Sequence, residues 1–217
     1  AQSGEDSGLS SEAYGWSDGI DVYDSLGQSH TLYFYFDQVD NDTISNAGSS
    51  RLYEYVVAMD PDEDGSSLAG TSGAGLLMSG TLRFTSSGNL VEQTAFAYDG
   101  AGDVHTLSNW APSDLSVNAT FASGGTANFT LDFGLGTTAS AGVANASLVS
   151  TNAAALGGTQ GQAVSPTMTS YDTAGSTLAM TQDGFPEGVL TNISIDREGN
   201  IIGDFTNAQN QVLDRFI

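Results

Sequence analysis

Three aspartates in one short loop have a spacing that suits calcium. Asp60, Asp62 and Asp64 stand at alternate positions, and Gly65 follows where a calcium-binding loop turns sharply. Carboxylate oxygens at this spacing are the ligands that a calcium ion prefers. The twelfth position of such a loop needs a bidentate acid, and here it holds Thr71. The three aspartates are therefore a calcium candidate with an incomplete ligand set, and the alternative is a solvated acidic turn.

Residues for enzyme catalysis are scarce. The chain has no Cys, and its two histidines, His30 and His105, lie far apart in the sequence. We interpret His30 as a polar edge residue at the start of a strand, and no acid or nucleophile stands at a suggestive spacing from His105. With 26 Asp and Glu, any fold brings some carboxylates close together, so paired acids for glycoside hydrolysis carry no signal alone. We predict no catalytic residue, no cofactor and no enzyme; a hydrolase with two acids in a cleft is the remotest alternative.

The charge balance excludes several partners. Four Arg and no Lys stand against 26 Asp and Glu, so the net charge is 4 − 26 = −22. Nucleic-acid binding needs a basic patch, and so does docking on an anionic membrane surface. No apolar run approaches the roughly 20 residues of a membrane span, and the first residues lack the basic and apolar regions of a signal peptide. We therefore expect neither nucleic acid nor membrane as a partner.

The elements that must position these residues are short strands. Apolar and polar residues alternate in many segments, turn residues separate them, and no sustained period of 3.6 residues occurs. We predict an all-β fold, a sandwich or barrel with long Gly-, Ser- and Asn-rich loops and almost no helix. The expected strands are 20–23, 29–36, 52–59, 76–84, 90–91, 103–107, 115–121, 127–133, 146–150, 188–195, 201–205 and 211–217. Segment 29–36 should pair with 52–59, and residues 134–161 should form an irregular loop over much of their length.

The same pattern predicts the core and the turns. Gly27 and Gly88 centre two turns that should need a positive φ or a tight backbone. Asp24 should cap the first of these turns through a side-chain hydrogen bond to its own backbone, with an exposed turn acid as the alternative. The expected core residues are Leu32, Phe34, Phe36, Tyr53, Tyr55, Val57, Leu82, Phe84, Leu90, Ile193, Ile195, Ile201 and Phe205.

Four segments resemble bacterial flagellar hook proteins, in the order found in that family. Residues 20–36 (IDVYDSLGQSHTLYFYF) are similar to the pattern V-Y-D-S-L-G-x-x-H-x-L-x-x-Y-F of the family. Residues 82–90 (LRFTSSGNL) are similar to its hairpin pattern L-x-F-x-x-x-G-x-L. Residues 182–190 (QDGFPEGVL) resemble the pattern Q-(D/N)-G-(Y/F)-x-x-G-x-L. Residues 193–207 then resemble the I-D-x-x-G-x-I-x-G-x-(Y/F)-(S/T)-N run of the family.

The resemblance implies a fragment with a particular layout. Hook proteins carry terminal helical segments that form the inner coiled-coil layer of a tube, and these residues contain neither. Their middle is a stack of β domains. We therefore expect a linker or arm at 1–19, an outer β domain at 20–183, and a hairpin and strand at 184–217 that return toward the inner hook domain. Residues from about 95 to 180 have room for an extra subdomain.

The function implied is structural. A hook protein forms a flexible tubular universal joint that transmits torque from the rod to the filament. Its partners would be other copies in a helical tube and, in the full-length protein, rod and hook–filament junction proteins. The resemblance places it in the extracellular flagellum, exported without a cleaved signal peptide, and a fragment without the helices should be monomeric. The alternative class is an acidic β-sandwich module of a surface-layer or adhesin protein that binds calcium through Asp60, Asp62 and Asp64.

Overall fold

The computed structural model describes residues 14–39, 51–98, 104, 106, 109–140, 159–163, 167–171 and 175–215. Alternating apolar and polar residues form antiparallel strands there, and none of these residues lies in an α-helix, so the all-β prediction is confirmed. No helix in this part of the chain is long and apolar enough to span a membrane. The elements are β1 (Trp16–Tyr23), β2 (Ser29–Gln38), β3 (Arg51–Met59), the 3-10 helix η2 (Pro61–Glu63), β4 (Leu76–Phe84), β5 (Leu90–Tyr98), β6 (Trp110–Pro112), β7 (Ser116–Thr120), β8 (Thr126–Thr130), β9 (Leu135–Ser140), β10 (Thr159–Ala163), β11 (Leu190–Ile195), β12 (Asn200–Phe205) and β13 (Asn210–Arg215).

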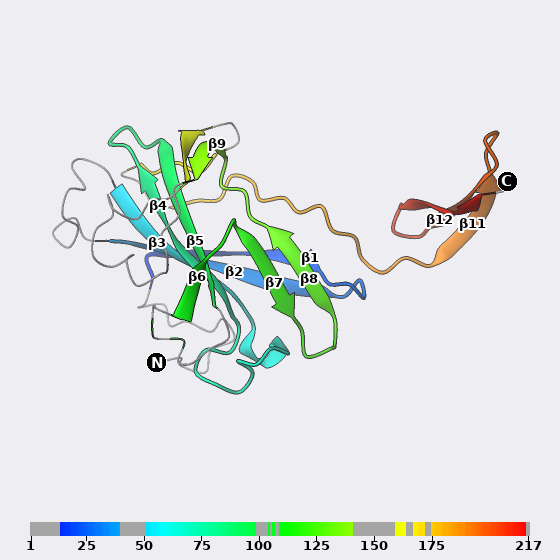
Figure 1. Ribbon diagram of the computed structural model, residues 1–217, viewed down its shortest axis with the longest axis horizontal. Helices are drawn as coiled ribbons and strands as arrows, with labels where there is room; N and C mark the ends of the chain where they lie inside the picture. Colours follow the sequence, from blue (N-terminus) through cyan, green and yellow to red (C-terminus); the bar gives the residue numbers. More distant parts are fainter. Residues whose placement is uncertain are drawn as a thin grey trace.

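The largest element is an antiparallel sheet in the order β1-β2-β3-β4-β5-β10-β9, with β6 paired to the end of β5. Segments 29–36 and 52–59 pair as predicted, with Phe34 opposite Val57. Strands β7 and β8 form a separate hairpin that lies across one face of the large sheet (Figure 1). The fold is therefore a curved sheet with a two-stranded ribbon packed on it.

The core fills the space between that sheet and the β7–β8 hairpin. One face of β2 contributes Leu32, Phe34 and Phe36, and the inner side of the hairpin contributes Val117 and Ala119. Because side chains alternate along a strand, β2 presents its two tyrosines to the opposite face. Eight of the thirteen expected core residues are buried, namely Leu32, Phe34, Phe36, Tyr55, Val57, Leu82, Phe84 and Leu90, and the partly buried Tyr53 packs against them.

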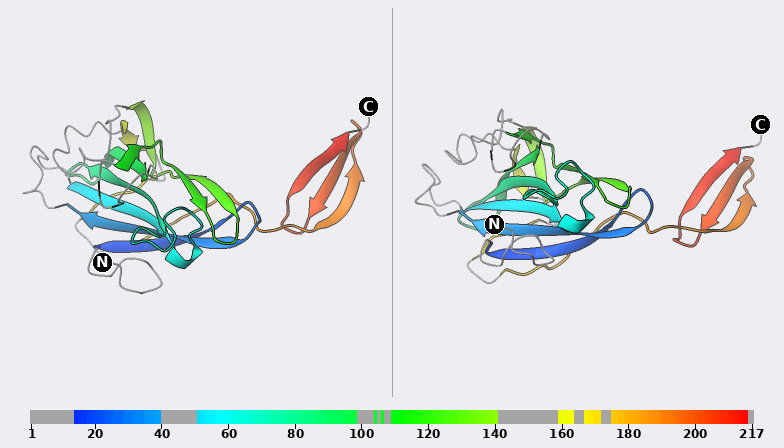
Figure 2. Two further views of the ribbon diagram at one scale, coloured as in Figure 1. Left: turned by 60° about the horizontal axis from the view of Figure 1, so that its bottom comes forward. Right: turned by 90° about the horizontal axis from the view of Figure 1, so that it is seen from below.

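A second sheet, β11-β12-β13, stands apart from the first and is joined to it by one extended segment (Figure 2). Cross-strand pairs place Ile193 opposite Gly203 and Ile195 opposite Ile201 on one face. The prediction that Ile193 and Ile195 are core residues is wrong, because their side chains are 56% and 60% exposed. Their alternation is correct, and no other described element covers the apolar face that it creates.

The other differences concern strand limits and strands that the sequence pattern did not reveal. The first strand begins at Trp16, four residues before the expected Ile20, and β6 was not predicted. Val104 lies in a turn rather than in the expected strand 103–107, and the expected strand 146–150 lies outside the described residues. The expected irregular loop 134–161 contains β9 and the start of β10. Apart from Leu135, these two strands consist of small and polar residues joined by backbone pairing, which leaves no alternation to detect.

Candidate functional site: the joint between the two sheets

Three segments far apart in the sequence meet where the two sheets are connected. We define this joint as the turn 24–28 between β1 and β2, the connecting segment 184–188 and the turn 206–209 between β12 and β13. The backbone N–H of Glu187 donates to the carbonyl oxygen of Gly27 (3.1 Å), and the side-chain amide of Asn207 donates to the carbonyl oxygen of Pro186 (2.8 Å). The connecting segment is thus bonded to a turn of each sheet.

The contact at Gly27 requires glycine for two reasons. Its φ is +77°, a conformation that other residues rarely adopt, as predicted for this turn. A Cβ atom at this position would also lie 2.3 Å from the backbone nitrogen of Glu187. The absence of a side chain therefore lets the connecting segment approach the turn. Gly88, the other predicted turn glycine, has a φ of +86°.

Gly27→Ala is expected to release the connecting segment. The left-handed backbone alone costs about 1–2 kcal/mol with a Cβ atom, and here the Glu187 backbone must also move. The control is Gly70→Ala, because Gly70 has a similar φ of +73° and open space around the position of a Cβ. Amide hydrogen exchange at Glu187 should become faster in Gly27→Ala and stay unchanged in Gly70→Ala. Equal exchange in both variants would contradict the role of this contact.

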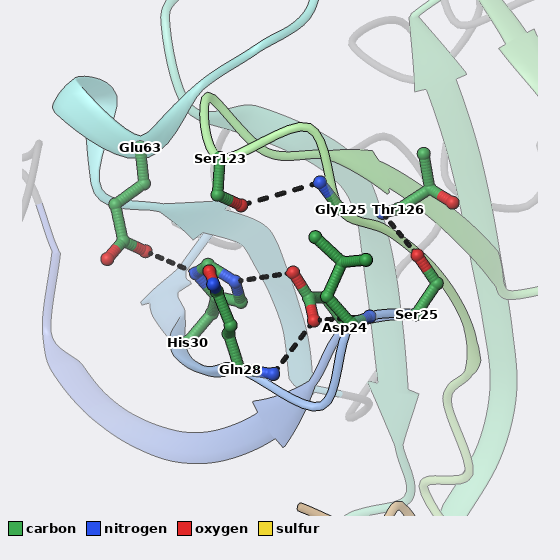
Figure 3. Close-up of polar contacts among 9 residues, drawn as sticks. Asp24, Ser25, Gln28, His30, Glu63, Ser123, Gly125 and Thr126 are labelled. Carbon is green, nitrogen blue, oxygen red and sulfur yellow. Dashed lines mark hydrogen bonds and ion pairs between the residues drawn. The ribbon is translucent and has the colours of Figure 1, made fainter. Parts of the chain in front are cut away.

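The turn at the joint is organised by a buried carboxylate, Asp24. One oxygen, Oδ1, accepts from the backbone N–H groups of Leu26 (2.8 Å) and Gln28 (2.9 Å), so the predicted side-chain cap is confirmed. The other oxygen, Oδ2, lies 3.2 Å from Nε2 of His30 (Figure 3). Burial by itself raises the pKa of Asp24, but the hydrogen bonds from Gln28, His30 and Leu26 outweigh it and hold the pKa below its ordinary value. The carboxylate is therefore ionised at the position where it accepts hydrogen bonds from the N–H groups of the turn.

His30 connects this turn to two further segments. Its Nδ1 atom lies 3.0 Å from Oε2 of Glu63, and its ring stacks on Phe121 with centroids 3.6 Å apart and an interplanar angle of 8°. The imidazole is 7% exposed, so the interpretation of His30 as a polar edge residue is wrong. Both ring nitrogens face carboxylate oxygens. Through these contacts the His30 ring connects the β1–β2 turn, η2 and the end of β7.

The β7–β8 hairpin closes over the same turn. A Cβ atom on Gly125 would lie 1.8 Å from Oδ2 of Asp24, so glycine is the residue that fits against the carboxylate. The N–H of Ser25 donates to the Thr126 carbonyl (2.8 Å). In return, the N–H of Thr126 donates to the Ser25 hydroxyl (3.1 Å) (Figure 3). The β7–β8 hairpin is therefore bonded directly to the turn 24–28 of the joint.

Comparison with known proteins identifies the family. Residues 5–185 match the model of the flagellar basal body protein FlaE D2 domain, which is most of the chain. The chain belongs to this family. It is a family of structural domains of the flagellar hook and not of enzymes. The match ends inside the joint, at position 185.

Solved structures and curated proteins add two observations. The chain is similar to a hook protein of Helicobacter pylori, FlgE2, with 15% identity and a TM-score of 0.36. That alignment covers 93% of this chain and 32% of the other, so the chain spans about a third of that hook protein's length. No curated protein matches the chain.

The three aspartates of the calcium candidate lie in and beside η2, the element whose Glu63 faces His30. Asp60 caps η2 by accepting from the N–H of Asp62 (2.9 Å), and the buried Asp64 accepts from the N–H groups of Ser66 (2.7 Å) and Gly75 (2.8 Å). In the described ranges no three His, Cys, Asp or Glu side chains gather as a metal site. Calcium binding by Asp60, Asp62 and Asp64 stays a prediction, which a calcium titration of thermal unfolding would test. His105 lies outside the described residues.

Sequence reasoning missed Glu63 and Gly125. Glu63 stands inside the acidic run 60–64, and it is the residue of that run whose carboxylate faces His30. Gly125 is one of 27 glycines, and no sequence pattern distinguishes it from the others. The available signal was His30 itself, which stands in the first segment that resembles hook proteins.

Proposed function

We propose that this chain is the central region of a flagellar hook subunit, which helps to form the tubular universal joint between rod and filament. The match of residues 5–185 to the D2 family is the observation that carries this proposal. The fold supports it, because a stiff β-module with a Ser-, Thr- and Asn-rich surface can make wet lateral contacts that slide as a tube bends. Its partners are other copies of itself and, in the full-length protein, rod and hook–filament junction proteins.

In this proposal, the two sheets on either side of the connecting segment 184–188 belong to different layers of the hook. Residues 20–183 form the outer, surface-facing domain, and residues 184–217 return toward the inner domain of the hook. The apolar face of β11–β13 supports this direction, because Leu190, Ile193, Ile195 and Leu213 are 41%, 56%, 60% and 47% exposed. A soluble module rarely leaves such a sheet face open unless another segment covers it. The location is the extracellular flagellum, reached by export without a cleaved signal peptide.

The experiment is to determine the structure of the tube formed by the full-length protein that contains this chain. We expect the large sheet to fit the outer part of the tube, with residues 184–217 directed toward the axis and the Ile193 face covered. Failure of the full-length protein to form a tube would refute the proposal, and so would a tube in which β11–β13 lies outermost. The 217 residues alone should sediment as a monomer.

A further inference from the structure

The negative charge of this chain is unevenly distributed along the sequence. The 57 residues from 115 to 171 contain one acid, Asp132, and no Lys or Arg. The other 160 residues contain the remaining 25 of the 26 acids. A strongly acidic chain thus includes one long segment that is almost free of charge, and the β7–β8 hairpin begins it.

The outer face of that hairpin is a ladder of uncharged polar side chains. Cross-strand pairs place Asn118 opposite Asn128 and Thr120 opposite Thr126, and all four are exposed. The amide of Asn128 donates to the side-chain oxygen of Asn118. We call this surface the outer ladder; it consists of Ser116, Asn118, Thr120, Thr126, Asn128 and Thr130. None of these six side chains is a carboxylate. Acids border both ends: Asp114, which is hydrogen-bonded to Ser116, and Asp132 at one end, and the acidic loop 60–64 at the other, where the N–H of Ala122 donates to the Glu63 carbonyl (2.8 Å).

Core packing on the inner side of the hairpin holds the outer ladder in place. The inner side of the hairpin buries Val117, Ala119 and Phe121 in the core, with Phe121 stacked on His30. The hydrogen bonds between Ser25 and Thr126 fix the start of β8. A surface that is ordered before contact loses little conformational entropy when it binds.

The charge distribution indicates what this surface contacts. Two copies with a net charge of −22 repel each other, and the repulsion is least where they meet through surfaces without carboxylates. Hydroxyl and amide groups donate and accept hydrogen bonds, so the ladder can bond to the polar surface of an identical chain in more than one register. A basic partner would instead be attracted to the acidic remainder of the molecule. The features of the ladder thus suit a second copy.

We propose that the outer ladder is a contact surface for a second copy of this chain within the assembled polymer. The inference rests on the proposed function, because it locates one of the contacts that a self-assembling subunit must make. It goes beyond that function by assigning the contact to one face of one hairpin.

The test adds one negative charge to the ladder of the full-length protein that contains this chain. Asn118→Asp is nearly isosteric and keeps the oxygen that accepts from Asn128. The control is Gln38→Glu, which adds the same charge at an exposed position beside Asp37. The critical concentration for polymerisation is expected to rise roughly three- to tenfold in Asn118→Asp at low ionic strength and to return toward the wild-type value in about 1 M salt. Gln38→Glu should polymerise like the wild type.

Hydrogen exchange provides a second readout. The backbone amides of 116–130 that exchange in the monomer should be protected when the wild-type protein polymerises. If the wild type polymerises, Asn118→Asp matches Gln38→Glu and the hairpin gains no protection, then the contact lies elsewhere, while the proposed function stands. If the wild type does not polymerise, the proposed function itself fails. Folding of each variant is checked by its thermal unfolding.

Discussion

Phe34→Ala is expected to lower the free energy of unfolding by about 3–5 kcal/mol, because it removes a buried ring and leaves a cavity. Phe34 is 7% exposed and lies in the middle of β2, between β1 and β3 in the large sheet. It faces the same core as the inner side of the β7–β8 hairpin. The measurement is equilibrium denaturation of the 217-residue chain, followed by tyrosine and tryptophan fluorescence. A loss below about 1 kcal/mol would contradict the core position of Phe34.

Ile193→Ala is the matched comparison. Both residues were expected in the core from the same alternation, yet the Ile193 side chain is 56% exposed on the open face of β11–β13. Its replacement should change the free energy of unfolding by less than about 0.5 kcal/mol in this chain. In the full-length protein the same substitution should cost more, because the proposed return of residues 184–217 to the inner domain would cover this face. Equal small effects in both proteins would contradict that proposal.

Phe34 and Ile193 show what apolar–polar alternation in a sequence can and cannot predict about burial. Alternation along residues 29–36 and 193–195 correctly identified which side of each strand is apolar. It could not say whether another element covers that side, because covering depends on contacts between distant segments. Phe34 belongs to the same core cluster as Val117 and Phe121 of a hairpin that lies more than 80 residues later in the sequence. Ile193 has no such partner among the described elements.

The joint was partly predictable for the same reason. The turn glycine Gly27 and the cap by Asp24 are local features, since their partners lie within four residues. The contact of Gly27 with Glu187 and that of His30 with Glu63 link residues 160 and 33 positions apart. Nothing in the local pattern distinguishes Glu63 from the aspartates around it. Only the fold brings its carboxylate to the imidazole.

Asp24→Ala is expected to lower the free energy of unfolding by about 3 kcal/mol, since it removes a buried carboxylate and leaves its hydrogen-bonding partners unsatisfied. The side chain of Asp24 is fully buried, and its loss leaves Nε2 of His30 and the N–H groups of Leu26 and Gln28 without that carboxylate. Asp196 offers a control, because its carboxylate accepts from N–H groups two and four residues ahead in the same way, without an imidazole and at the surface. Asp196→Ala should cost much less than Asp24→Ala.

The pH dependence of stability separates the charge of Asp24 from its shape. The pKa of Asp24 is lowered in the folded protein from its ordinary 3.8, so its contribution to stability is complete above that value. The contribution is lost as the pH falls through the lower, folded pKa. Asp24→Asn keeps the shape and removes the titration, so its stability should be reduced near neutral pH and should fall less steeply than that of the wild type on acidification. Parallel stability curves for the two proteins between about pH 5 and pH 2 would show that the ionised carboxylate does not stabilise the turn, because a group whose pKa is equal in both states adds no slope.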